Sequence, residues 1–107
     1  MDPDPPFAPA LNTALRSSLA YLDGLDKRPV PATATLEELR SSLRKPLSDA
    51  GMDPHTVIEE LVRDTQNGFV GSAGGRFFAW GIGGSLPAAL AADWLTSAWD
   101  QNAVLYA

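Results

Sequence analysis

The chain contains no cysteine and a single histidine, His55. It can therefore hold neither a disulfide framework nor a thiolate metal site, and one histidine leaves little material for zinc. Basic residues are also scarce, eight against thirteen acidic ones, which gives a net charge of -5 and a pI near 4.5. This balance argues against a nucleic-acid partner, because such proteins carry a clustered basic patch. Apolar runs of membrane-spanning length and signal-peptide features are missing too, so we expect a soluble cytoplasmic protein without a membrane partner.

Charge and glycine divide the chain into two unlike parts. Residues 1–64 hold 18 of the 21 charged residues, and seven of the nine glycines fall within residues 68–84. We expect the first part to be solvated and the second to be largely covered. The predicted organisation is a flexible proline-rich arm (1–9), a helical segment (10–68), and an aromatic and glycine-rich crossing with a buried helix (69–107) that leads into a domain this chain lacks.

Three short amphipathic helices are predicted before the glycine region. Leucines spaced by four and three residues along one face predict a helix over 10–23, which Gly24 ends. Thr35 and Glu38 form a capping-box pattern that opens a second helix, ending before Pro46. Asp53 followed by Pro54 predicts the start of a third helix, which continues toward residue 68.

A fourth helix is predicted after Ser85, whose hydroxyl can cap the first turn. Its side chains are apolar on nearly every side, as in an element that is buried all round. The final residues, 103–107, are apolar as well, whereas natural chain ends are usually polar. We therefore expect this chain to be the front part of a longer protein.

The glycine run from Gly81 to Leu86 superficially resembles a dinucleotide-binding fingerprint. That fingerprint requires a small residue where Leu86 stands, and no strand–helix alternation precedes it. Two readings stay open: the glycines allow a sharp turn, or their backbone lines a substrate pocket. His55 is expected to face solvent or to cap its helix, and Glu59 and Glu60 point about 100° apart, so they do not form a paired-carboxylate site.

The order of motifs after residue 75 resembles that of a known enzyme family. The run Arg76-Phe77-Phe78-Ala79-Trp80, then Ser85-Leu86-Pro87-Ala88-Ala89 and finally Trp99-Asp100-Gln101-Asn102 is similar to the N-terminal part of the pyridoxal-phosphate (PLP)-dependent amino-acid decarboxylases, the group that includes aromatic-amino-acid decarboxylase. The upstream helix over 10–23 and the Val30-Pro31 turn fit the same family. The likeness covers about residues 10–107.

This resemblance implies a mainly α segment, made of the N-terminal helical region and the start of the large α/β domain of an aspartate-aminotransferase-like enzyme (PLP fold type I). It implies no catalytic residue in this chain, since neither Lys27 nor Lys45 stands in the family's Schiff-base motif, so no cofactor is expected on this segment alone. Trp80, Gly81 and Ile82 match the family's substrate-contacting positions, although the aromatic enzymes carry bulkier or hydroxylated residues there.

The implied partners are a second copy of the chain, the remainder of the same enzyme and a small amino-acid substrate. The homodimer interface is predicted at two helices, through Leu11, Leu15, Leu19, Leu90, Trp94 and Leu95. The alternative is a freestanding helical interaction module without catalysis, whose apolar fourth helix docks a partner.

Overall fold

The computed structural model describes residues 6–78, 84–102 and 104. Within these ranges the chain forms four helices and no strand: α1 (Ala8–Asp23), α2 (Leu36–Leu43), α3 (Pro54–Thr65) and α4 (Pro87–Trp99). The prediction of a mainly α segment is confirmed for this part of the chain, in which nothing indicates the start of an α/β domain. Phe77 and Phe78 lie in irregular backbone, and the other two residues of the predicted crossing, Ala79 and Trp80, fall outside the described ranges.

The first helix begins two residues earlier than its leucine pattern predicts. Pro9 lies in its first turn, where a proline is tolerated because the amide it lacks would have no intrahelical partner. At the other end Gly24 stops the helix, as predicted. The N–H of Gly24 donates to the carbonyl oxygens of Ala20 at 3.1 Å and Tyr21 at 3.2 Å.

The starts of α2 and α3 follow the two signals in the sequence. At α2 the capping box is complete: the Glu38 amide donates to Thr35 Oγ1 at 3.1 Å, and the Thr35 amide donates to Glu38 Oε1 at 3.3 Å. The third helix begins at Pro54 after Asp53, also as predicted. Asp53 makes no side-chain cap, however, so only the position of that start is correct.

The predicted serine cap of the fourth helix is wrong, because Leu86 rather than Ser85 occupies the N-cap position and no side chain caps this helix. Pro87 decides the start, since its fixed φ suits the first helical residue. A residue before proline is driven out of the helical region. Leu86 is accordingly extended, with φ -99° and ψ 140°.

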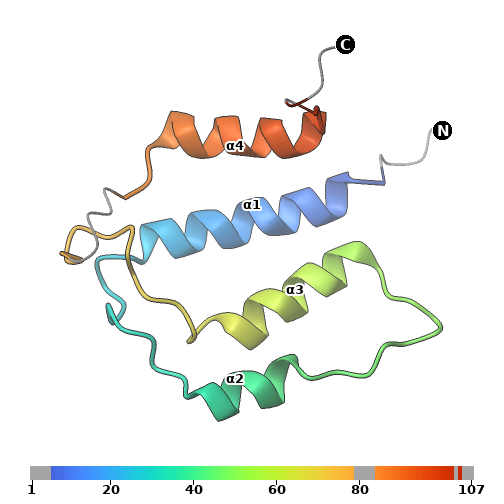
Figure 1. The fold of residues 1–107 in the computed structure, drawn as a ribbon, viewed down its shortest axis with the longest axis horizontal. Coiled ribbons are helices and arrows are strands. Elements are labelled where there is room, and N and C mark those ends of the chain that lie inside the picture. The colour runs from blue at the N-terminus through green and yellow to red at the C-terminus, as the bar shows by residue number, and fades with distance from the viewer. Residues whose placement is uncertain (1–5, 79–83, 103, 105–107) are drawn as a thin grey trace.

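Three of the helices form one layered unit, with α3 between α1 and α2 (Figure 1). α1 and α3 run in the same direction, so their carboxyl ends lie at the same end of the unit, while α2 runs the opposite way. In contrast, no Cα atom of α4 lies within 8 Å of a Cα atom in the other three helices. Below, "the helical unit" means α1, α2 and α3.

The chain does not close a hydrophobic core of its own within the described ranges. No apolar side chain there is buried; the buried polar side chain is that of Thr13. The radius of gyration is 16.9 Å, whereas a compact domain of this length has about 13 Å. Large apolar surface therefore stays in contact with solvent. Among the helices that the structure describes, none is both long and apolar enough to cross a membrane.

Candidate interaction surface

The leucines predicted to form a dimer interface lie in one exposed row along α1. Leu11, Leu15 and Leu19 follow each other at four-residue spacing, which places them on one side of a helix. Their exposed fractions are 52%, 45% and 51%. This leucine row is an apolar surface that no other described part of the chain covers.

The more covered positions in the first three turns of α1 carry small residues, while Tyr21 and Leu22 are partly covered near its carboxyl end. Ala10, Thr13, Ala14 and Ser17 repeat at three- and four-residue spacing and are among the more shielded positions of the helix. The Thr13 hydroxyl donates to the Pro9 carbonyl oxygen at 3.0 Å, so its burial leaves no polar atom unpaired. Small side chains at covered positions allow close helix packing, and the leucine row is the more exposed part of α1.

The fourth helix is apolar but not buried, contrary to the expectation from its sequence. Leu86, Leu95 and Trp99 are exposed, and the predicted interface residues Leu90 and Trp94 are only partly covered. The physical reason is that α4 does not pack closely on the other described helices, since no Cα atom of α4 lies within 8 Å of theirs. A helix with this composition needs a cover that the described part of the chain does not supply.

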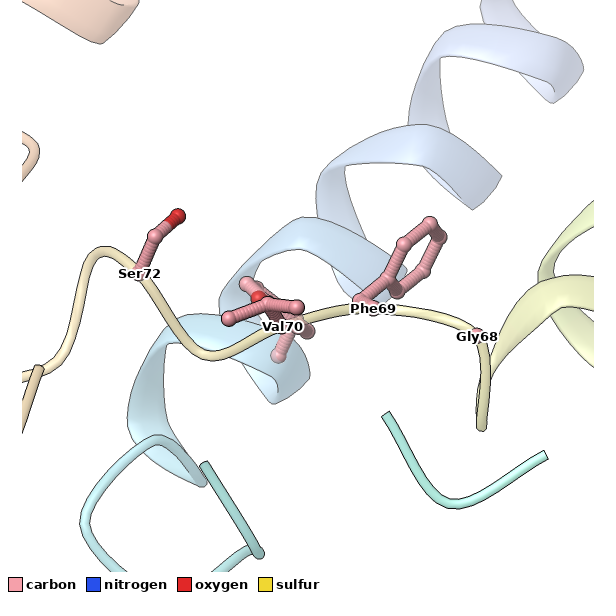
Figure 2. A pocket seen from close by; sticks show the side chains of 5 residues that line it. Gly68, Phe69, Val70 and Ser72 are labelled. Carbon is pink, nitrogen blue, oxygen red and sulfur yellow. The ribbon is translucent and has the colours of Figure 1, made fainter. Parts of the chain in front are cut away.

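A shallow cavity of about 510 Å³ lies where α1 meets the segment after α3 (Figure 2). Tyr21, Gly68, Phe69, Val70 and Ser72 line it. The rings of Tyr21 and Phe69 meet edge to face, with centroids 5.9 Å apart and an interplanar angle of 85°, a favourable aromatic geometry. The cavity is wide open to solvent and carries no titratable group suited to catalysis, so we assign it no reaction.

Two arginines, Arg28 and Arg76, hydrogen-bond to backbone carbonyl groups near this junction, and the sequence patterns did not indicate these contacts. The guanidinium of Arg28 lies 4.8 Å from the centroid of the Tyr21 ring, and its Nη2 donates to the Gln66 carbonyl oxygen at 2.6 Å. Nη2 of Arg76 donates to the carbonyl oxygens of Leu25, at 3.0 Å, and of Arg28. A single arginine has no periodicity, so no signal in the sequence could have found these contacts.

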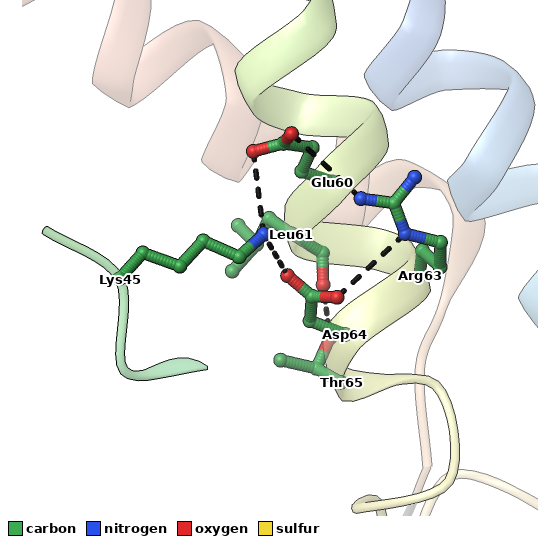
Figure 3. A network of polar contacts seen from close by, with 6 residues as sticks. All are labelled: Lys45, Glu60, Leu61, Arg63, Asp64 and Thr65. Atoms are coloured by element: carbon green, nitrogen blue, oxygen red, sulfur yellow. Dashed lines mark hydrogen bonds and ion pairs between the residues drawn. The ribbon is translucent and has the colours of Figure 1, made fainter. Parts of the chain in front are cut away.

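An ion-pair network joins the loop after α2 to one face of α3 (Figure 3). Nζ of Lys45 lies 2.5 Å from Asp64 Oδ2 and 3.3 Å from Glu60 Oε2, and Arg63 lies 3.7 Å from both acids. The hydrogen bond from Lys45 lowers the pKa of Asp64, and the same bond raises the pKa of Lys45, opposed in each case by desolvation. The Lys45 amine is therefore held protonated, which is the wrong state for a nucleophile.

The remaining candidate chemistry is sparse. In the ranges that the structure describes, no cluster of three histidine, cysteine or acidic side chains could hold a metal ion. Lys27 is exposed in the turn after α1, and His55 lies partly covered in the first turn of α3, with Nε2 3.5 Å from Thr56 Oγ1. The predicted substrate-contacting residues Trp80, Gly81 and Ile82 lie outside the described residues.

Comparison with known proteins gives no identification, since no protein-family model, curated protein or solved structure matches this chain.

Proposed function

We propose that this chain is the N-terminal, dimer-forming segment of a PLP-dependent amino-acid decarboxylase, a carboxy-lyase. The observation that supports the proposal best is the unpartnered apolar surface formed by the leucine row of α1 and by α4. A segment that completes its packing with a second polypeptide would carry such a surface. The choice of enzyme family rests on the resemblance of the ordered motifs from Arg76 to Asn102.

In this proposal the chain's own residues bind and orient rather than react. The leucine row and α4 form the contacts with a second copy, and Trp80, Gly81 and Ile82 form one wall of the substrate pocket. Pyridoxal phosphate, held by the remainder of the enzyme, would supply the electron sink for decarboxylation. The residues present do not fit covalent attachment of this cofactor, because Lys45 is paired with two carboxylates and Lys27 lies exposed in the turn after α1. The lysine that holds it would lie beyond residue 107.

The test uses the product of the complete reading frame. It would be purified with pyridoxal phosphate, reduced with borohydride and analysed by peptide mass, while carbon dioxide release from a panel of L-amino acids is measured. We expect one cofactor adduct on a lysine after residue 107, together with decarboxylation of at least one amino acid. Absence of both adduct and carbon dioxide release would refute the proposal, and so would a stoichiometric adduct on Lys27 or Lys45.

The second candidate function is a freestanding helical interaction module. The Cα separation of more than 8 Å between α4 and the helical unit favours it, because an apolar helix without closely packed neighbours suits docking of a partner protein. The two proposals separate in the same experiment. A reading frame that stops at residue 107 and yields a non-catalytic protein supports the interaction module.

A further inference from the structure

Two exposed faces of this chain carry apolar side chains, one on α1 and one on α4. The first is the leucine row of α1. The second, which we call the α4 face, follows a spacing of four, three and four residues, so its members share one side of the helix. It consists of the exposed residues Ala88, Ala92, Leu95 and Trp99. Leu90 and Trp94, which are partly covered, lie on a different side of α4.

These two helices are also the poorest in charge. Of the 21 charged residues of the chain, α1 holds Arg16 and Asp23, and α4 holds Asp93. Depletion of charge beside exposed large apolar side chains is typical of the centre of a protein interface. The leucine row and the α4 face therefore have the composition of surfaces that another polypeptide covers.

The chain exposes far more surface than a compact protein of its mass. Its accessible surface is 9060 Å², whereas a folded monomer of 11.4 kDa exposes about 5,800 Å². The surplus of about 3,300 Å² exceeds what one partner contributes to a stable dimer, since permanent interfaces bury about 2,000–5,000 Å² over both partners. A second copy of the chain is thus a large enough cover.

The leucine row and the α4 face match in length and spacing when their helices run in opposite directions. Leu11 and Leu15 are four residues apart, and so are Leu95 and Trp99. Placing Leu15 opposite Leu95 therefore brings Leu11 opposite Trp99. In this register the whole of α4 lies alongside residues 11–23 of α1.

The few charges favour this antiparallel direction. Arg16 is the one basic residue of α1 and Asp93 the one charged residue of α4, and neither forms an ion pair within the described ranges. In the antiparallel register they lie on the same flank of the helix pair, about 1.5 Å apart in height along the axes. In a parallel pair with Leu15 opposite Leu95 they would lie on opposite flanks.

We propose that α4 of one copy covers the leucine row of a second copy, and that the second copy's α4 covers the first in return. Within one chain no Cα atom of α4 lies within 8 Å of α1, so a chain does not cover its own row. A two-fold axis satisfies both faces of both copies without a third protein. This inference rests on the dimer of the proposed function and names the pairing that holds it together.

Cross-linking tests the pairing cleanly, because the 107-residue chain has no cysteine of its own. Chains carrying Leu11→Cys and chains carrying Trp99→Cys are mixed in a glutathione redox buffer, at a concentration where the wild-type chain sediments as a dimer. The matched control mixes Leu19→Cys with Trp99→Cys. Leu11 and Leu19 are equally exposed, at 52% and 51%, but lie about 12 Å apart along α1.

We expect the disulfide between Leu11→Cys and Trp99→Cys chains to form at least about tenfold faster than the control disulfide, since cysteines with Cα atoms more than about 7 Å apart cannot be bridged without backbone movement. Leu15→Cys mixed with Leu95→Cys should also cross-link rapidly. This second pair keeps both tryptophan side chains of α4 and so covers the case in which Trp99→Cys disturbs folding. Circular dichroism checks that each variant keeps its helices.

Four outcomes would overturn the inference. Equal rates in the Leu11→Cys mixture and its control exclude the antiparallel register. Faster cross-linking of Leu15→Cys with itself than with Leu95→Cys shows that like helices pair. A Leu15→Cys/Leu95→Cys double variant that closes its disulfide within a monomer, while the mixed single variants do not react, shows that each chain covers itself.

The fourth outcome is a wild-type chain that stays monomeric at every concentration, which removes the proposed dimer as well. The first two outcomes leave a dimer with a different interface. None of the four decides the decarboxylase assignment, because the cofactor adduct and carbon dioxide release test that assignment separately.

Discussion

Replacing Leu15 by aspartate should weaken the proposed dimer by one to two orders of magnitude. Leu15 lies in the middle of the leucine row and is 45% exposed in the single chain. Complete burial of a leucine is worth about 1.5–3 kcal/mol, so covering the exposed 45% contributes about 0.7–1.3 kcal/mol. A two-fold interface contains the residue twice, which gives about 1.4–2.7 kcal/mol, or about a 10- to 100-fold increase in the dissociation constant.

The assay is analytical ultracentrifugation of the chain over a wide concentration range. Leu47→Asp is the matched control, because it introduces the same charge at a loop residue that is 100% exposed and outside the predicted interface. Circular dichroism of each variant checks that the helices are retained. Leu95→Asp tests the α4 part of the surface in the same way.

Three results would contradict this reasoning. A wild-type chain that sediments as a folded monomer at every concentration excludes the dimer. If a Leu15→Asp variant with intact helices dimerises as tightly as wild type, the dimer interface does not include the leucine row of α1. Equal weakening in Leu47→Asp shows that charge alone, and not the leucine row, controls association.

Further predictions concern the capping box, the ion-pair network and the lysines. Thr35→Ala should lower the free energy of unfolding by about 1 kcal/mol through loss of the α2 cap, measured by denaturant titration with Thr33→Ala as the control. Lys45→Gln should lower the melting temperature slightly at neutral pH, and the difference should shrink with added salt. Pairing lowers the pKa of Asp64, so the stability that Asp64 contributes to the fold is present above about pH 3.9 and is lost as pH falls through the folded pKa. Pairing raises the pKa of Lys45, so the stability that Lys45 contributes is lost only as pH rises above about 10.4. A difference that is largest at the acid extreme would be inconsistent with this assignment. Borohydride reduction of the 107-residue chain with pyridoxal phosphate should yield no single stoichiometric adduct at Lys27 or Lys45, as judged by peptide mass.

The helices could be predicted because their signals are local. The capping box at Thr35, the Asp53-Pro54 start and the stop at Gly24 each depend on neighbouring backbone groups only, and the structure has all three where the sequence indicates. The Ser85 cap failed for an equally local reason. Pro87 restricts the residue before it more strongly than a serine hydroxyl can favour an earlier start.

The surroundings of the helices could not be predicted from these patterns. An apolar stripe indicates that a helix side needs a cover, but it does not say whether the cover belongs to the same chain. The leucine row of α1 and the apolar sides of α4 are exposed for this reason. The contacts of Arg28 and Arg76 are made to backbone carbonyl groups. Because every residue has such a group, these contacts cannot be recognised in the amino-acid sequence.

The division of α1 into a small-residue side and a leucine side also has a consequence for how this chain can change over time. Substitutions at the covered positions Ala10, Thr13, Ala14 and Ser17 should disturb the packing of α1, whereas substitutions in the more exposed leucine row should disturb it less. Natural variation or engineering can therefore alter what the outer side binds without unfolding the helical unit. A library randomised at Leu11, Leu15 and Leu19 would yield folded variants with new pairing preferences, and one randomised on the inner side would mostly yield unfolded chains.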